Sequence, residues 1–256
     1  MASTAARVSL RADGHATVSL AGHDIVTGAY TVVAITAADR LGLSIHRVEV
    51  RMDDSTPPPA SLAAGSRHTA TITHAVTWAC NAVIRRLADA AVASNGPLAG
   101  QKAEALRLTN GRLGALFGPN EPLEDAVRRV TGGAVEIHAE HVPEGLPPES
   151  VDKLYSGKLA MLRGHQRQDI HAYAYGAQFV EVRVHRLTCE IRVLRMAGAF
   201  AAGTIVNPLT ALSQYMGGMI WGLGAALEER TEIDLAHARY VNDNLSEYPV
   251  PVNADV

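Results

Sequence analysis

Residues 22–31, Gly-His-Asp-Ile-Val-Thr-Gly-Ala-Tyr-Thr, have the composition of a turn that could hold an anion. The segment follows an alternating apolar and polar stretch and leads into an apolar stretch from Thr31 to Leu41, which predicts a strand, a glycine turn and a helix. Backbone N–H groups at such a helix N-terminus point toward a negatively charged group. The segment matches neither GxxxxGK(S/T) nor GxGxxG, so its spacing alone identifies no ligand.

A second segment of this kind runs from Ala63 to Thr69, Ala-Ala-Gly-Ser-Arg-His-Thr, before an apolar helix that is predicted to reach Val92. Ser66 or Thr69 can cap this helix, and Gly65 would let the backbone approach a ligand closely. Arg67 would add positive charge to a second anion site. The alternative interpretation is a plain capped helix with an exposed arginine.

The third segment, from Gly203 to Glu229, is an apolar stretch that contains Gln214 as its one long polar side chain. Asn207-Pro208 is typical of a helix start, with asparagine as the N-cap and proline in the first turn. Four glycines follow within this helix, and each costs roughly 1 kcal/mol relative to alanine. We therefore expect a buried helix with another element or a ligand close to its backbone; in the alternative, Gln214 only satisfies a neighbour in a packed core.

The overall composition is that of a globular protein of 256 residues, with 47% hydrophobic and 19% charged residues. A net charge of −3 gives no basic surface for nucleic acid, and the apolar stretch after Met216 is too short to span a membrane. Cys80 and Cys189 lie far apart without metal-binding spacing and are interpreted as reduced thiols. No export signal is visible, so we expect a cytoplasmic location, with export to the periplasm through a partner subunit left open.

The remaining elements predict an α+β fold in which β-hairpins pack with helices. A hairpin is expected over residues 7–20 around Asp13-Gly14, and a helix C-cap at Gly42. Further elements are expected as follows: a strand over 43–52, a short helical piece over 103–108, a helix over 123–130, strands over 134–142, 172–184 and 190–196, and a strand pair near 232 and 239–241. Residues 143–170 contain the region where the chain would subdivide.

Three sequence stretches together, DIVTGAYT, AAGSRHTA and the run from GAQFVEVRVHR to GAALEE, give the chain a family resemblance. It resembles the molybdenum-cofactor subunit of the xanthine dehydrogenase and aldehyde oxidase family. The resemblance covers most of the chain and implies that residues 1–256 are the second molybdopterin-binding domain, incomplete at its C-terminus. The first cofactor domain and a C-terminal segment with a catalytic glutamate would be missing.

The resemblance also implies the cofactor contacts, which are Thr27, Gly28, Gly65, Ser66, Arg67, His68 and Gln214. The implied cofactor is molybdenum-molybdopterin, with or without a cytosine dinucleotide, while iron–sulfur clusters and FAD would belong to partner subunits. No catalytic residue and no protein ligand to the metal are assigned. Carboxylates such as Glu181 and Glu228-Glu229 are interpreted as strand-edge or solvated helix-end charges.

The sequence departs from the family pattern where Val26, His74 and Cys189 replace glycines and where His185 and Ala201 replace aspartates. Valine does not readily adopt a positive φ, so these replacements indicate either relaxed constraint or a strained site.

The implied function is the cofactor-binding part of a hydroxylase that oxidises aldehydes or hydroxylates N-heterocycles such as purines. The alternative is a non-catalytic remnant or scaffold that no longer binds the cofactor. A third reading, an unrelated hydrolase or ligand-binding module, has no G-x-S-x-G motif to support it.

Overall fold

The computed structural model describes residues 2–52, 54–158 and 173–256. The chain divides into two compact units, residues 1–171 and 172–256, and each is described here by itself. Part of the predicted subdivision region (159–170) and the first residue of the strand predicted from 172 lie outside the described residues. The assignment of the whole chain to one cofactor domain stays a prediction.

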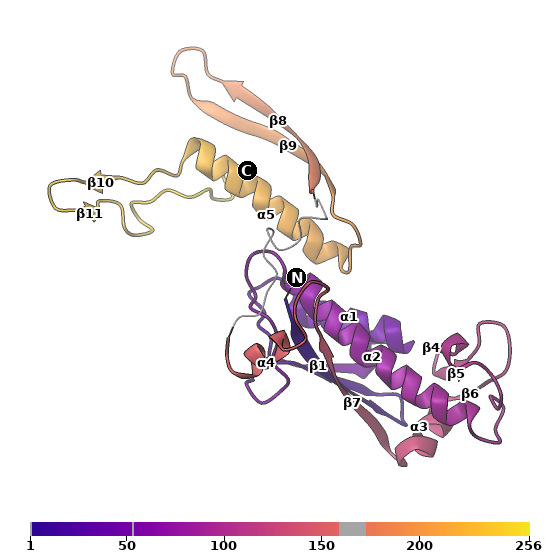
Figure 1. Cartoon of the computed structure of the whole chain (residues 1–256). Helices are drawn as coiled ribbons and strands as arrows, with labels where there is room; N and C mark the ends of the chain where they lie inside the picture. The colour runs from indigo at the N-terminus through magenta and orange to yellow at the C-terminus, as the bar shows by residue number, and fades with distance from the viewer. Residues whose placement is uncertain (1, 53, 159–172) are drawn as a thin grey trace. The chain divides into compact units, whose positions relative to one another are not determined.

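The first unit is built on a four-stranded sheet in the order β3-β2-β1-β7 (Figure 1). Its strands are β1 (Thr4–Arg11), β2 (Ala16–Ser19), β3 (Val48–Arg51) and β7 (Ala134–His141). β1 runs antiparallel to β2 and β7, whereas β2 and β3 are parallel. The predicted hairpin is confirmed: Val8 pairs with Val18, and Gly14 in the turn has a φ of 78°.

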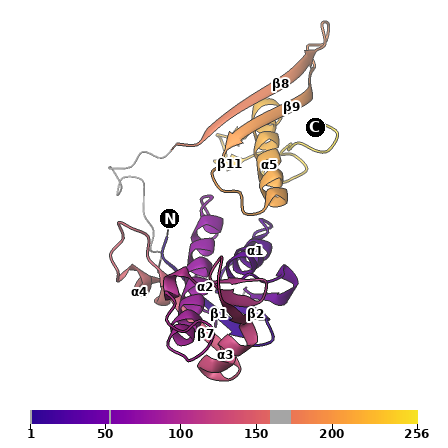
Figure 2. The ribbon, with the colours of Figure 1, turned by 90° about the vertical axis from the view of Figure 1, so that its right-hand side faces the viewer.

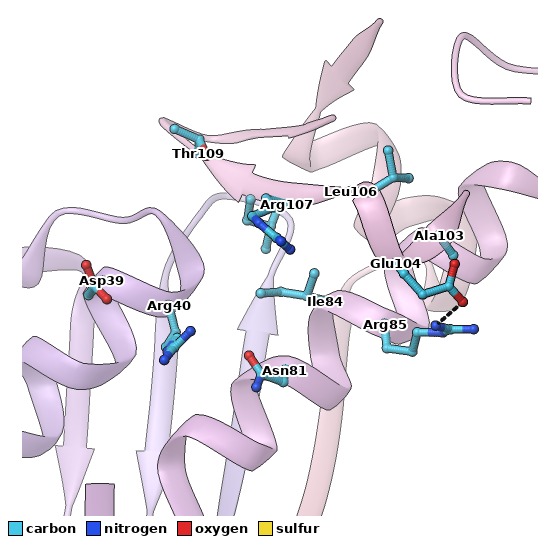
Figure 3. Close-up of a pocket in the computed structure, with 11 residues that line it drawn as sticks. Asp39, Arg40, Asn81, Ile84, Arg85, Ala103, Glu104, Leu106, Arg107 and Thr109 are labelled. Carbon is cyan, nitrogen blue, oxygen red and sulfur yellow. Dashed lines mark hydrogen bonds and ion pairs between the residues drawn. The ribbon is translucent and has the colours of Figure 1, made fainter. Parts of the chain in front are cut away.

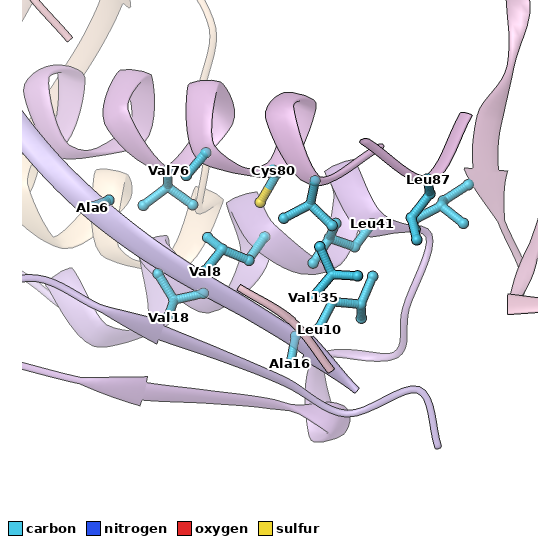
Figure 4. Close-up of a cluster of buried hydrophobic side chains, with 14 of the residues drawn as sticks. Ala6, Val8, Leu10, Ala16, Val18, Leu41, Val76, Cys80, Leu87 and Val135 are labelled. Atoms are coloured by element: carbon cyan, nitrogen blue, oxygen red, sulfur yellow. The ribbon is translucent and has the colours of Figure 1, made fainter. Parts of the chain in front are cut away.

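Two long helices, α1 (Ala29–Leu41) and α2 (His68–Val92), pack side by side against the sheet (Figure 2). α1 ends at Gly42, which has the predicted left-handed cap conformation. The predicted apolar face of α2 is also confirmed, because all five of its members are fully buried: Val76, Ala79, Cys80, Val83 and Leu87. Figure 4 shows this face meeting Val8, Leu10 and Val18 of the sheet. The core of the first unit therefore lies between α2 and the sheet.

Smaller elements complete this unit, with α4 (Ser150–Tyr155) near the start of β1 and the others toward its far end (Figure 1). The others are η1 (Ile45–Arg47), η2 (Ala103–Ala105), the sheet β4 (Arg107–Thr109), β5 (Arg112–Gly114) and β6 (Asn120–Pro122), and helix α3 (Leu123–Thr131). The prediction of helix over residues 103–108 is wrong beyond 105, where β4 pairs with β5 instead. The strand predicted over 43–52 is limited to β3, because the single 3-10 turn of η1 precedes it.

The second unit contains one long hairpin, one helix and one short strand pair. The hairpin joins β8 (Tyr175–Val184) to β9 (Ile191–Ala201), and the pair consists of β10 (Ile233–Asp234) and β11 (Arg239–Tyr240). Helix α5 (Pro208–Leu227) begins as predicted, with the Asn207 side chain accepting a hydrogen bond from the Leu209 N–H at 3.1 Å.

The prediction that α5 is a buried helix is wrong for the described chain. Only Leu223 and Gly224 of this helix are buried. An added Cβ would meet no atom within 4 Å at Gly217, Gly218 or Gly222, whereas at Gly224 it would meet Pro251. The physical reason is that the second unit has too few elements to cover an apolar helix of this length.

Both cysteines are free thiols, as predicted. Burial raises the pKa of the Cys80 thiol to about 12, which keeps it protonated and unreactive. Among the helices of the described residues, none combines the length and the apolar character needed to cross a bilayer.

Candidate functional site

Two loops of the first unit come together at the start of α2, around the side chain of His68. One is the loop before α1, where a Cβ added to Gly22 would lie 3.5 Å from the His68 ring. The charges of His23 and Asp24 in the same loop act on His68. The other is the loop that leads directly into His68 through Gly65, Ser66 and Arg67. All the predicted contacts except Gln214 lie on these two loops or at the start of α2.

The N-terminus of α1 already has an anionic partner, the side chain of Asp24. Its Oδ1 accepts hydrogen bonds from the N–H groups of Thr27 at 2.9 Å and Gly28 at 3.1 Å. Sequence reasoning missed this role, although aspartate side chains commonly accept hydrogen bonds from nearby backbone N–H groups in turns. A ligand at Thr27 and Gly28 therefore has to contact their other atoms or compete with Asp24.

Backbone strain is present at the two positions where a non-glycine residue replaces a glycine of the family pattern in a turn. Val26 has a φ of 67° with a side chain that is 97% exposed, and Cys189 has a φ of 59°. The left-handed conformation costs an L-residue roughly 1–2 kcal/mol. Of the two readings drawn from the sequence, this conformation favours the strained site.

Neither α1 nor α2 has a side-chain hydrogen bond at its N-cap residue, and the α1 end differs only in that Asp24 accepts hydrogen bonds from the N–H groups of Thr27 and Gly28. Arg67 is the N-cap residue, so the prediction that Ser66 or Thr69 caps this helix is wrong. Ser66 adopts a φ of 52° directly after Gly65 at 64°, and Thr69 lies inside the helix. This pair of left-handed residues reverses the chain before the helix and keeps the Ser66 hydroxyl out of capping geometry. Within the part of the chain that the structure describes, no side chain caps the N-terminus of α2.

His68 is the most unusual polar group in this region. The residue is 8% exposed, and neither Nδ1 nor Nε2 has a hydrogen-bond partner among the described residues. A backbone group of Ser61 lies close by without reaching hydrogen-bonding geometry. Burial, reinforced by the charge of His23, lowers the pKa of His68. A neutral imidazole with two unused nitrogens, next to an uncapped helix end, is suited to a polar ligand.

The first unit should lose stability in mild acid because two of its histidines have lowered pKa values. Burial lowers the pKa of His68, and burial and the nearby His74 lower that of His141, whose ring stacks on His74 at 5.2 Å. Both groups take up protons more readily when unfolded, so the free energy of unfolding should fall as the pH drops below about 6.5, by at most about 1.4 kcal/mol per pH unit for each histidine.

Urea unfolding monitored between pH 7.5 and 5 checks this expectation. In the variant His68→Gln/His141→Gln the free energy of unfolding should fall less steeply between pH 6.5 and 5 than in the parent. In His46→Gln, which changes an exposed histidine, it should fall as steeply as in the parent. An equally steep fall in the double variant would contradict the conclusion that His68 and His141 cause the loss of stability in acid.

Gln214 lies in the second unit, on an exposed face of α5. With about 3.6 residues per helical turn, Gly217, Gly218 and Trp221 share this face. Trp221 is 78% exposed, and the two glycines leave the backbone open. The carboxylates named from the sequence have ordinary surroundings: Glu181 pairs with Arg195 at 2.9 Å, and Glu229 accepts a hydrogen bond from Tyr248 at 3.2 Å.

Comparison with known proteins identifies the fold of this arrangement. The family model described as "Molybdopterin cofactor-binding domain" matches residues 1–256. The chain belongs to this family. The resemblance noted in the sequence is thereby confirmed.

Two curated relatives show where this domain occurs. The chain is 35% identical over 251 residues to the aldehyde oxidoreductase molybdenum-binding subunit PaoC of Escherichia coli O157:H7. It is 26% identical over 255 residues to the putative xanthine dehydrogenase molybdenum-binding subunit XdhA of Escherichia coli K12. Each alignment covers 98% of this chain, but the chain spans only 30% and 31% of the relatives' lengths.

Solved structures show the same fold at low sequence identity. Quinoline 2-oxidoreductase from Pseudomonas putida 86 matches with a TM-score of 0.79 and 21% identity over 100% of this chain and 30% of that chain. The Cu,Mo-CO dehydrogenase matches with a TM-score of 0.76 and 15% identity over 98% of this chain and 29% of that chain. These matches confirm the α+β prediction, and the structure itself contains both helices and antiparallel β-hairpins.

Proposed function

We propose that this chain is the molybdenum-cofactor-binding part of an oxidoreductase that oxidises aldehydes or hydroxylates N-heterocycles such as purines. The single observation that carries the proposal is the cluster at the start of α2, where the buried, unpartnered His68 adjoins an uncapped helix end. Family membership supplies the identity of the ligand, and the names of the relatives supply the two substrate classes.

The residues present fit the molybdopterin cofactor. Gly65 has no side chain and a φ of 64°, and the Arg67 guanidinium lies against it, 2.6 Å from the position a Cβ would take, so the loop offers a positive charge beside a bare backbone. The N–H groups of the first turn of α2 can donate to an oxyanion such as the phosphate of the pterin, and His68 can donate to a polar atom. The cofactor, when bound, supplies the redox chemistry, and these residues bind and orient it.

Gln214 would add an amide contact from α5, and Thr27 and Gly28 would add contacts from the loop that Asp24 organises. The remaining electron-transfer groups, iron–sulfur clusters and FAD, would be carried by partner subunits or domains. In this proposal the pterin form, with or without a cytosine dinucleotide, stays open, and the compartment is the cytoplasm.

Removal of His68 should reduce pterin content without unfolding the protein. The chain, or its variant His68→Leu, is co-expressed with the segments that are present in its longer relatives but lie outside these 256 residues. Pterin fluorescence is then quantified after oxidation. Loss of a hydrogen bond to a charged or polar ligand predicts at least about a tenfold lower pterin occupancy at limiting cofactor.

The matched control is His141→Leu, which removes another histidine that has a buried, unpartnered nitrogen but lies outside the two loops. It should retain the parent's pterin content. Equal pterin content in the two variants would remove His68 from the site.

The second candidate, a remnant without cofactor, is favoured by the replacement of family glycines by Val26 and His74 and by the hydrogen bonds of Asp24 to the backbone before α1. It predicts that the parent and the variant Val26→Gly/His74→Gly both purify without pterin, even when the complex with the co-expressed regions assembles.

A further inference from the structure

A pocket of about 520 Å³ opens on the first unit, at the end of α1 away from the candidate cofactor loops. Figure 3 shows its walls: the last turn of α1, the middle of α2, and the segment through η2 and β4. Arg40 lies twelve residues after Gly28, the N-cap residue of α1, which corresponds to about 18 Å along the helix axis. None of the predicted cofactor contacts lines this pocket.

Buried residues anchor the segments that form the walls, so we expect the pocket to keep its shape. Leu41, Leu106 and Leu108 are at most 4% exposed. The cap residue Gly42 lies directly against the backbone of β4, where an added Cβ would come within 2.6 Å of the Leu108 carbonyl oxygen. The end of α1 and β4 therefore cannot move apart without breaking the core.

Three arginines line the pocket, but only one of them is neutralised. Arg85 pairs with Asp89 at 2.8 Å and with Glu104 at 2.7 Å. Over the described ranges, neither Arg40 nor Arg107 forms an ion pair or a side-chain hydrogen bond. In Figure 3 these two arginines stand on different walls, one on α1 and the other on β4, with Ile84 and Asn81 of α2 nearby.

The pocket therefore offers two guanidinium groups, one amide and an apolar floor. Asp39 also lines the pocket and forms no ion pair within the described ranges, so the positive charge is only partly offset. Guanidinium groups bind carboxylate and phosphate oxygens in a bidentate manner, and a volume of several hundred Å³ is that of a small-molecule site.

We propose that this pocket binds a small molecule that carries carboxylate or phosphate groups, which bridge Arg40 and Arg107. The amide of Asn81 would supply a further donor, and Ile84 would contact the carbon skeleton. This site is separate from the candidate cofactor loops and does not depend on the presence of the pterin.

The test is calorimetric titration of the full chain with pyrophosphate and, separately, with citrate. We expect saturable binding of at least one probe, and the probe that binds more tightly identifies the oxyanion. The variant Arg40→Gln/Arg107→Gln should weaken that binding about tenfold or more, since it removes both bidentate partners. Arg40 and Arg107 are exposed, so we expect the variant to fold, which circular dichroism verifies.

Two controls keep the result specific to the pocket. Arg86→Gln removes an exposed arginine of α2 that does not line the pocket and should bind the probe as the parent does, while Arg67→Gln removes the arginine of the candidate cofactor loop and reports any probe bound there. Absence of saturable binding for both probes, or equal binding by the Arg40→Gln/Arg107→Gln variant, would overturn the proposal. Loss of binding in Arg67→Gln would assign the anion to the cofactor loops instead.

Discussion

The substitution Gly42→Ala is expected to destabilise the first unit by about 3 kcal/mol. Gly42 is the left-handed cap of α1, with a φ of 60°, so any side chain there is strained. The added Cβ would also come within 2.6 to 2.8 Å of three backbone atoms of Leu108 and Thr109, which cannot rotate away. Urea unfolding at neutral pH measures the loss.

Gly132→Ala separates the two causes. Gly132 caps α3 with a φ of 78°, but no atom lies within 4 Å of the Cβ that would be added. Its cost should be limited to the conformational strain of about 1–2 kcal/mol. If both variants lose the same stability, the close contact between the end of α1 and β4 is wrong, and with it the rigid wall of the anion pocket.

The isolated chain is expected to self-associate at micromolar concentration through the exposed side of α5. Leu209 is 79% exposed, Leu212 is 59% exposed and Met216 is 54% exposed, and their spacing places them along one side of the helix. Burying two such side chains is worth about 3 kcal/mol, so Leu212→Gln/Met216→Gln should weaken association about a hundredfold. Sedimentation velocity measures the shift toward monomer.

The matched variant for this experiment is Leu116→Gln/Phe117→Gln, which changes two side chains that are 83% and 93% exposed in a loop of the first unit. It should associate as the parent does. A parent chain that sediments as a monomer at micromolar concentration would show that the exposed side of α5 needs no cover.

Features set by neighbouring residues could be predicted from the sequence. The Asp13-Gly14 turn fixed the first hairpin, because the two turn residues and the alternating strands act over a few positions. The apolar face of α2 followed from its helical period, since those side chains pack against the unit's own sheet.

Features that depend on distant or external groups could not be predicted in this way. Burial of α5 was expected from its composition, but burial requires a covering surface that the second unit does not have. The cap at α2 was assigned by residue type to Ser66 or Thr69, but the loop sets a left-handed conformation at Ser66 and Thr69 lies inside the helix. The Arg40 and Arg107 pocket was not anticipated, because its members come from segments that meet only through tertiary packing.

The measurement that most directly tests the account is the molybdenum and pterin content of the chain, purified in complex with the regions of its longer relatives. Elemental analysis and pterin fluorescence after oxidation should each give about one equivalent per chain. An assembled complex that contains neither molybdenum nor pterin would contradict the proposal that this domain binds the cofactor.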